Sequence, residues 1–249
     1  MLTKQNIKYI QSLQYKKFRD EYGVFIAEGP KVILELLNDG SFNCSALYAL
    51  QEWVENIDNN HIAALGDRLI IVEPFELEKI ANYMTPNAAV AVFEKKQQLL
   101  LPDFQNEITL MLDGIQDPGN LGTIIRTADW FGVKQIVCSE KTVDLYNSKV
   151  VQSTMASLGR VSVVYTDLSS WLLQHNDIKK YATVVEEGIS LKNIEKVNGC
   201  ILMIGNESNG LSEEFVALAD EKITIPKSGN AESLNAAIAT AIILYELKR

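Results

Sequence analysis

The fold is decided in residues 108–128, which read ITLMLDGIQDPGNLGTIIRTA. The first five residues are an apolar run of strand length, and the turn-forming residues Asp-Pro-Gly-Asn follow shortly after. Beyond them Leu121, Ile124, Ile125 and Ala128 recur at i, i+3, i+4 and i+7, the spacing of a helix with one apolar face. The stretch therefore predicts a strand, a tight turn and a helix, the unit from which parallel α/β sheets are built.

The same alternation of short apolar runs and helical patterns extends through the whole chain. Residues 94–107 lack a clean period, so we predict a small α/β domain at 1–95, a linker at 96–107 and a second α/β domain at 108–249. The alternation favours a mostly parallel sheet covered on both faces. Besides 108–112, strands are expected at 24–27, 46–50, 69–72, 88–93, 135–138, 160–165, 181–185, 200–204 and 222–225.

The charge of the chain is unevenly distributed. The 249 residues contain 23 Lys and Arg against 32 Asp and Glu, a net charge of −9 that by itself argues against a nucleic-acid partner. Residues 1–31, however, hold six basic and three acidic groups, which leaves 17 basic and 29 acidic groups for the remainder. The basic charge is thus concentrated at the N-terminus, where it could meet phosphates.

Several classes of site are disfavoured by the residue inventory. The two histidines, His61 and His175, have no second His or Cys at metal-ligand spacing, so no metal site is expected. Gly-x-Ser-x-Gly, P-loop and Gly-x-Gly-x-x-Gly patterns do not occur. Cys44, Cys138 and Cys200 are odd in number and far apart, which favours a reducing, cytoplasmic location. No apolar run approaches the roughly 20 residues of a membrane span.

Two polar side chains stand out in the loop and helix after residue 112. Asn120 lies at the expected start of the helix, and Arg126 lies nearly opposite its apolar stripe at about 100° per residue. Ligands of parallel α/β sheets gather where strands end and helices begin. The alternative is a solvated arginine with Asn120 as an ordinary helix cap.

Two later loops also carry polar residues at the ends of apolar strands. Glu207 follows the apolar run 201–204 in a loop with glycines at both ends. Turn chemistry before a helix explains the glycines but not the position of the acid. Ser233 and Asn235 open a helix, expected from Ser233 onward, that is apolar almost all round. Such a helix is normally buried in a core or between subunits.

Together these three loops resemble the signature motifs of the SpoU/TrmH family of RNA ribose 2′-O-methyltransferases, within the SPOUT group. The resemblance rests on Asp-Pro-Gly-Asn-Leu-Gly at 117–122 followed by Arg126, on Gly-Asn-Glu-x-x-Gly at 205–210, and on Ile-Pro at 225–226 with Ser-Leu-Asn at 233–235. Residues 16–29 also look like the family's N-terminal substrate-recognition domain. The resemblance therefore covers essentially the whole chain.

The resemblance implies a C-terminal α/β domain with a deep trefoil knot, which topology rules alone would have rejected. It also implies a homodimer formed by that domain and S-adenosylmethionine as the cofactor. Gly205, Ile225 and Leu234 would then hold the adenosine part, largely through backbone contacts. Lys227 departs from the methionine that the family commonly has after Ile-Pro, which bears on the loop around the cofactor or the entering RNA.

By the same resemblance Arg126 has the central catalytic role, with Asn120, Glu207, Ser233 and Asn235 forming the polar wall of the site. The pKa of an arginine side chain is above about 12, so Arg126 stays protonated and is a poor general base. We therefore expect it to orient the hydroxyl and stabilise the developing alkoxide.

The implied substrate is ribosomal or transfer RNA, whose phosphates Lys16, Lys17 and Arg19 would contact. A solvated helix face is the simpler explanation of these three basic residues. Two rival functions stay open at this point: a non-catalytic RNA-binding or ribosome-assembly factor that keeps the fold, and a metabolic α/β enzyme that uses a small nucleotide. Five polar site residues together disfavour the first, and the basic N-terminus disfavours the second.

Overall fold

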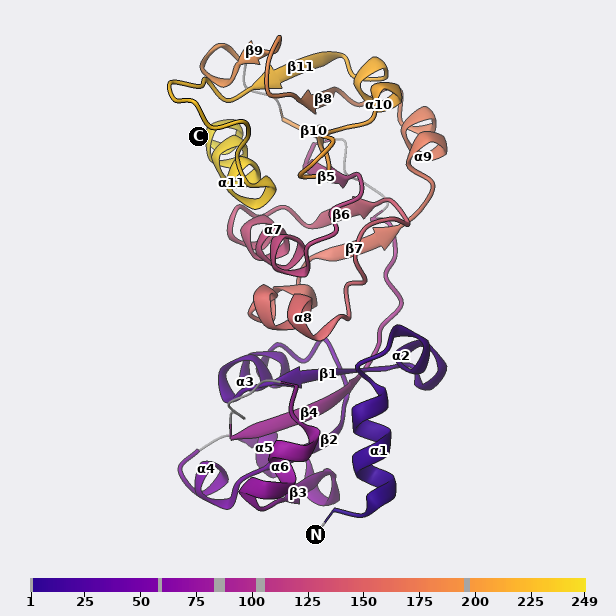
Figure 1. Cartoon of the computed structure of the whole chain (residues 1–249), viewed down its shortest axis with the longest axis vertical. Helices are drawn as coiled ribbons and strands as arrows, with labels where there is room; N and C mark the ends of the chain where they lie inside the picture. The colour runs from indigo at the N-terminus through magenta and orange to yellow at the C-terminus, as the bar shows by residue number, and fades with distance from the viewer. Residues whose placement is uncertain (1, 58–59, 83–87, 102–105, 195–197) are drawn as a thin grey trace. The chain divides into compact units, whose positions relative to one another are not determined.

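The computed structural model describes residues 2–57, 60–82, 88–101, 106–194 and 198–249, which form two compact units (Figure 1). Unit 1 comprises residues 1–97 together with 144–159, and unit 2 comprises residues 98–143 and 160–249. Part of the expected linker, residues 102–105, lies outside the described residues. The assignment of 144–159 to unit 1 differs from the prediction that everything after residue 107 forms one domain.

The reason for this difference is an aromatic contact between residues distant in sequence. The ring of Tyr146 lies 4.9 Å from that of Phe25 and 6.5 Å from that of Phe42, centroid to centroid, so it packs into the core of unit 1. Burying one aromatic ring among others is favourable, but the local sequence pattern does not predict a contact between residues so far apart.

Unit 1 contains a four-stranded sheet in the order β1-β4-β2-β3, in which β4 runs antiparallel to both its neighbours and β2 runs parallel to β3. The expectation of a mostly parallel sheet is therefore wrong for this unit, because residue periodicity locates strands without giving their direction. Its elements are α1 (Lys4–Ser12), α2 (Lys16–Tyr22), β1 (Val24–Glu28), α3 (Pro30–Asp39), β2 (Cys44–Ala49), α4 (Gln51–Glu55), α5 (Asn60–Ala63), β3 (Leu69–Ile71), α6 (Pro74–Ile80), β4 (Ala89–Glu94) and α8 (Ser148–Thr154).

The first two helices of unit 1 have different origins. The hydroxyl of Thr3 accepts a hydrogen bond from the backbone N–H of Asn6 and so caps α1, and Ile10 and Leu13 are buried in the core. Helix α2, which begins at Lys16, is separate from α1, a break that the local pattern did not indicate. It ends at Gly23, whose φ of 66° is the left-handed conformation that glycine adopts most readily.

Unit 2 contains a seven-stranded sheet in the order β7-β6-β5-β10-β8-β11-β9, in which every described pair is parallel, as predicted. Figure 1 shows α7 and α11 on one side of this sheet and α9 and α10 on the other. Its elements are β5 (Ile108–Leu112), α7 (Pro118–Trp130), β6 (Gln135–Cys138), β7 (Ser162–Tyr165), α9 (Leu168–Gln174), β8 (Lys180–Thr183), β9 (Ile189–Ser190), β10 (Cys200–Ile204), α10 (Glu213–Ala217), β11 (Glu221–Thr224) and α11 (Ala236–Lys248).

The core of unit 2 follows from the two-residue period of its strands. Met111 and Met203 point to the side of the sheet where Trp171 of α9 and Phe215 of α10 pack. All five residues of β5 and of β10 are buried, as expected for strands covered on both faces. Since the strands are parallel, their carboxyl ends lie at one edge of the sheet, where the three loops singled out above emerge.

The described residues were also compared with the requirements of a metal site and of a membrane-spanning helix. No group of three or more His, Cys, Asp or Glu in that part of the chain is arranged to hold a metal ion. None of the described helices combines the length and the apolar character that crossing a membrane requires.

Candidate active site at the carboxyl edge of the parallel sheet

The loops after β5 and β10 are joined by one side chain, Asn206. Its Nδ2 donates to the carbonyl oxygen of Gly114 at 2.7 Å, and its Oδ1 accepts from the backbone N–H groups of Ser208 and Asn209 at 2.9 and 3.3 Å. An amide with both ends occupied has one orientation, so Asn206 fixes the two loops against each other. It was missed in the sequence because asparagine is common in turns.

The same loop requires a glycine at position 205. A Cβ built there would lie 2.1 Å from the carbonyl carbon of Gly210 and 2.1 Å from the nitrogen of Leu211, distances that no side chain tolerates. The close approach is held by two backbone hydrogen bonds between Asn206 and Gly210, at 3.0 and 2.9 Å. The glycine is therefore explained by the folding of its own loop.

The start of α7 presents Asn120 toward the other two loops. Asp117 caps this helix by accepting a hydrogen bond from the N–H of Asn120, so Asn120 is free from the capping role considered above. Its Nδ2 donates to Oε1 of Glu207 at 2.7 Å, and its Oδ1 accepts from Nδ2 of Asn235 at 2.8 Å. The side chains of Asn235, Asn120 and Glu207, called here the Asn–Asn–Glu relay, connect all three sequence motifs.

Asn235 anchors the relay to α11. Its Oδ1 accepts from the backbone N–H groups of Ala237 and Ile238, so the helix begins at Ala236 and not at Ser233 as expected. Because the cap occupies Oδ1, Nδ2 is the group that faces Asn120. The direction of each hydrogen bond in the relay thus follows from the helix cap, and the relay ends on a carboxylate with acceptor capacity to spare.

Arg126 and Ser233 lie outside this relay. Arg126 is exposed on α7, and Leu121, Ile124, Ile125 and Ala128 on the opposite face are buried, as the stripe predicted. Within the described part of the chain Arg126 forms no hydrogen bond or ion pair, and none joins it to Glu207. Ser233 is likewise exposed, ahead of the helix. Both side chains are available to a ligand.

The cofactor residues implied by the resemblance lie in loops at the same edge. Gly205 and Ile225 directly follow β10 and β11 and are half-buried, whereas Leu234 is exposed although it is apolar. Backbone groups at strand ends and accessible apolar side chains suit a largely uncharged adenosine, which needs shape and a few hydrogen bonds more than ionic clamps. The residues present therefore fit the expected cofactor.

Arg19 in unit 1 requires a correction. Only 3% of the residue is exposed, and its guanidinium donates to the carbonyl oxygens of Leu13 and Gln14 at 2.9 and 2.7 Å and to Asp144 at 2.6 Å. A guanidinium engaged in this way cannot contact an RNA phosphate. A single sequence could not show this, because Asp144 lies 125 positions away.

The two neighbouring lysines remain at the surface. Nζ of Lys16 pairs with Asp20 at 2.7 Å, and Nζ of Lys17 lies 5.8 Å from the ring centre of Phe18. Both lysines are exposed, but only Lys17 has no ion pair within the described residues.

Comparison with known proteins bears on the whole chain. Residues 107–245, more than half of the chain, match the model described as SpoU rRNA Methylase family. The chain belongs to this family. Residues 4–91 match the model described as MRM3-like substrate binding domain.

Relatives of the SpoU chain are similar over nearly its full length. The RlmP protein of Bacillus subtilis, a 23S rRNA (guanosine(2553)-2′-O)-methyltransferase, is 29% identical over 98% of this chain and 96% of its own. A 23S rRNA (uridine(2479)-2′-O)-methyltransferase of Streptomyces viridochromogenes is 30% identical, over 100% of this chain and 91% of its own. The AdoMet-bound structure of an rRNA methyltransferase from Sinorhizobium meliloti has a TM-score of 0.87 and 31% identity, over 100% and 95% of the two chains. The chain is thus an RNA methyltransferase of the SpoU family.

Proposed function

We propose that this chain transfers a methyl group from S-adenosylmethionine to a ribose 2′-hydroxyl of ribosomal RNA, at the carboxyl edge of the unit 2 sheet. The observation that carries the assignment is the Asn–Asn–Glu relay, which joins the three motifs at distances of 2.7 and 2.8 Å. The relatives act on 23S rRNA at two different nucleotides, so the choice of nucleotide belongs to each protein.

The cofactor would be held by Gly205, Ile225 and Leu234. When bound, it supplies a methyl group on a positively charged sulfur. The apolar side chains Ile225 and Leu234 would cover the adenosine and exclude water from it. Lys227, two residues after Ile225, is exposed and lies where it could meet the entering RNA.

The protein must align the hydroxyl and manage its proton. The ribose oxygen forms the new bond to the methyl carbon as the bond from that carbon to sulfur breaks, and the hydroxyl proton goes to a water or an RNA phosphate oxygen. Arg126, permanently cationic, would stabilise the alkoxide character that develops on the oxygen. The Glu207 carboxylate, held by Asn120, would orient the ribose or the guanidinium, and Ser233 would complete the polar wall.

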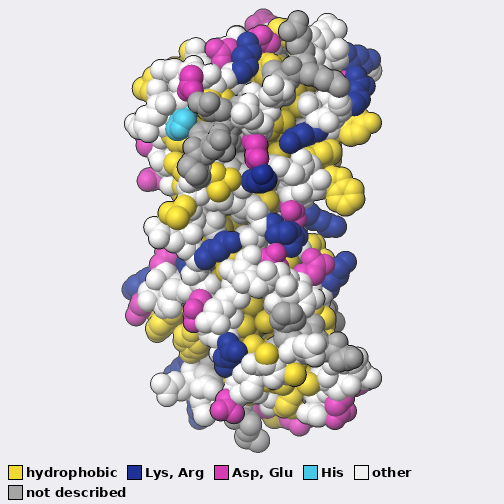
Figure 2. All heavy atoms as spheres, turned by 180° about the vertical axis from the view of Figure 1, so that it is seen from behind, with side chains coloured by type: hydrophobic (Ala, Val, Ile, Leu, Met, Phe, Trp, Pro, Cys, Tyr) yellow, Lys and Arg dark blue, Asp and Glu magenta, His cyan; other side chains and the backbone are white. Residues whose placement is uncertain are grey.

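The exposed face of α7 and α11 supports a homodimer. Trp130 is 85% exposed, and Ile238, Ile242 and Tyr245 on α11 are also accessible. In Figure 2 hydrophobic side chains stand out at the edge of unit 2 that carries α7 and α11 in Figure 1. Exposed apolar groups that cluster on one face are typical of a contact with another molecule. Trp130 lies one turn from Arg126, so a second copy on this face would border the active site.

Three further features belong to the proposal. A trefoil knot is supported by the position of β10 between β5 and β8 and by the tie of its following loop to Gly114. RNA binding by unit 1 is supported by the match of residues 4–91 and by the accessible Lys17. The cytoplasmic location expected from the sequence remains a prediction.

The decisive experiment compares wild type with Arg126→Ala in two assays. Radiolabelled methyl transfer to ribosomal RNA from cells lacking the protein is expected to fall at least about 100-fold in the variant, the effect of losing a donor to a developing oxyanion. Calorimetric affinity for S-adenosylmethionine should stay within about twofold, because the exposed Arg126 supports no other residue. Transfer at the wild-type rate would refute the catalytic role, and absence of transfer by the wild type to any RNA would favour the non-catalytic RNA-binding alternative.

A further inference from the structure

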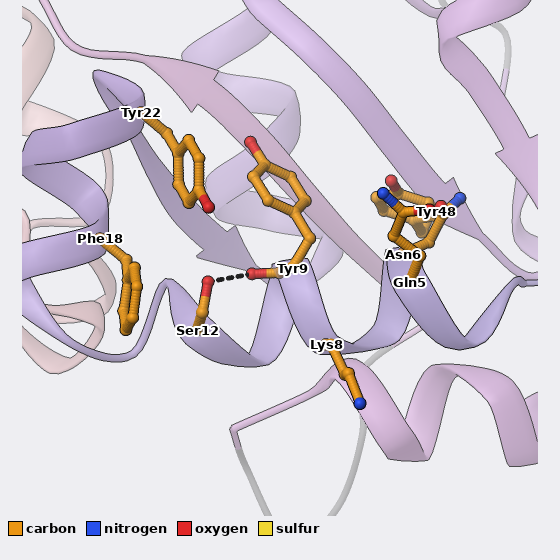
Figure 3. A pocket seen from close by; sticks show the side chains of 8 residues that line it. All are labelled: Gln5, Asn6, Lys8, Tyr9, Ser12, Phe18, Tyr22 and Tyr48. Carbon is orange, nitrogen blue, oxygen red and sulfur yellow. Dashed lines mark hydrogen bonds between the residues drawn. The ribbon is translucent and has the colours of Figure 1, made fainter.

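Unit 1 contains a hollow that the methyl-transfer site leaves unused. It measures about 530 Å³ and lies between α1, α2 and β2, with Tyr9, Phe18, Tyr22 and Tyr48 among its lining residues. Figure 3 shows these aromatic side chains together with the polar side chains of α1. Unlike an ordinary core cluster, the hollow is open, and Tyr22 is 47% exposed.

The aromatic rings are held in a defined arrangement. The rings of Tyr9 and Tyr22 meet edge to face, with centroids 5.1 Å apart and planes at 70°, and those of Phe18 and Tyr22 lie 6.4 Å apart with planes at 15°. Edge-to-face and offset-parallel pairs are the favourable geometries of aromatic rings. The arrangement therefore holds the half-exposed ring of Tyr22 in place against Tyr9 and Phe18, so little conformational freedom is lost when a ligand stacks on it.

Basic side chains on α1 border the hollow, and Figure 3 shows Lys8 pointing away from Tyr9 and Tyr22. Lys8 lines the hollow, and Lys4 lies one turn away on the same face of α1, a helix without a single acidic residue. Like charges four residues apart destabilise a helix. Neither lysine has an ion pair within the described residues, whereas Lys16 and Lys95 share Asp20. This face of α1 is thus prepared for an external anion.

Polar groups for a base edge are also present. The amide of Gln5 is exposed at the rim and has no hydrogen-bond partner among the described residues. The hydroxyls of Tyr9 and Tyr22 form no described hydrogen bond either. Aromatic rings, amide and hydroxyl groups and a lysine around one hollow are a combination by which proteins recognise unpaired bases of RNA.

We propose that Tyr9, Phe18 and Tyr22 form a stacking site for an unpaired nucleobase of the RNA substrate, with Lys4 and Lys8 on the flanking phosphates. The inference rests on the proposed function, since it presumes an RNA substrate. It assigns to unit 1 the recognition of a single-stranded element, distinct from the ribose that is methylated in unit 2.

The test uses the full chain and fluorescein-labelled oligoribonucleotides, single-stranded or annealed to a complement, with affinity measured by anisotropy. Tyr22→Ala is expected to weaken binding of the single strand at least about fivefold, the loss of one stacked base. Tyr22→Phe, which keeps the ring, and Tyr15→Ala, which removes a 66% exposed tyrosine outside the hollow, should stay within about twofold of wild type. Lys8→Gln should reduce the magnitude of the slope of log affinity against log salt concentration by about 1, the value expected for the loss of one phosphate contact.

The outcomes separate this proposal from the proposed function. Unchanged single-strand affinity in Tyr22→Ala would overturn the stacking site, as would an equal loss for the paired RNA. If the wild type methylates ribosomal RNA in the same preparation, that result leaves the catalytic assignment intact. Retained thermal melting temperature in Tyr22→Ala shows that the loss is one of recognition.

Discussion

Oε1 of Glu207 accepts a hydrogen bond from Nδ2 of Asn120 at 2.7 Å, across 87 positions of sequence. This bond links the loop after β10 to the first turn of α7. Because Oδ1 of Asn120 is occupied by Asn235, the amide cannot turn over without losing both contacts. The position of the Glu207 carboxylate therefore depends on the cap of α11.

Asn120→Asp tests this dependence. The new carboxylate would still accept from Asn235 but would repel Glu207, since like charges at hydrogen-bond distance are unfavourable. We expect the kcat of methyl transfer to fall about 100-fold, a loss of roughly 2.7 kcal/mol in transition-state stabilisation. Asn43→Asp is the matched control, because Asn43 accepts from Arg68 in unit 1 and gains a favourable charge. Steady-state kinetics that show equal rates for the two variants would contradict the prediction.

Arg19→Met tests whether Arg19 stabilises unit 1. The substitution leaves Asp144 and the carbonyls of Leu13 and Gln14 without their donor, and breaking a buried charged pair costs about 3 kcal/mol. Lys16→Met removes an exposed pair and should change the free energy of unfolding by less than about 1 kcal/mol. Urea denaturation measures both. A stability near that of wild type for Arg19→Met would mean that the buried contacts contribute little.

Trp130→Glu tests the proposed dimer. A carboxylate in place of the exposed indole should shift the chain from dimer to monomer, because burying an unpaired charge at an interface is costly. Leu173→Glu introduces the same charge at an exposed position of α9, on the other side of the sheet, and should leave the dimer intact. Analytical ultracentrifugation measures the mass. A monomeric wild type, or a dimeric Trp130→Glu, would refute the assignment of this face.

The three cysteines should be unreactive in the folded protein. All are buried. Burial raises the pKa of the Cys44 thiol to about 11 and that of Cys200 to about 12, and it raises the pKa of Cys138 as well. The ordinary pKa of a thiol is about 8.5. Alkylation by iodoacetamide at about that pH should therefore modify none of the three until guanidinium unfolds the chain. Mass spectrometry counts the modified cysteines, and fast modification of any one in the folded state would show that its site opens locally.

The same pKa shifts predict a pH dependence of stability. Because the thiols ionise first in the unfolded chain, the free energy of unfolding should fall as pH rises above about 8.5. Urea denaturation at increasing pH measures this fall, and a free energy of unfolding that stays constant would contradict the prediction.

The sequence predicted the parallel sheet of unit 2 because each of its features is local. An apolar run of five residues followed by a turn and an i, i+3, i+4, i+7 stripe specifies β5 and α7 with little ambiguity. It predicted less of unit 1, where strand direction and the short helix α2 depend on packing. The inclusion of residues 144–159 in that unit depends on Tyr146 and Phe25, which no local pattern connects.

The charge of the chain shows the same division. The basic N-terminus was visible in composition, but only the fold separates Arg19, which is buried on Asp144, from Lys17, which is exposed. Likewise, the sequence does not show whether Asn120 is an ordinary helix cap or a residue of the site. The structure separates them because Asp117 supplies the cap and leaves the amide of Asn120 to Glu207 and Asn235.

The sequence by itself determined the family, the parallel sheet of unit 2 and the identity of the polar residues, since residue type and spacing are properties of the chain. Only the tertiary structure decided which of these residues meet. The parallel strands bring the loops after β5, β10 and β11 to one edge, and hydrogen bonds between groups 87 and 115 positions apart form only once that edge exists.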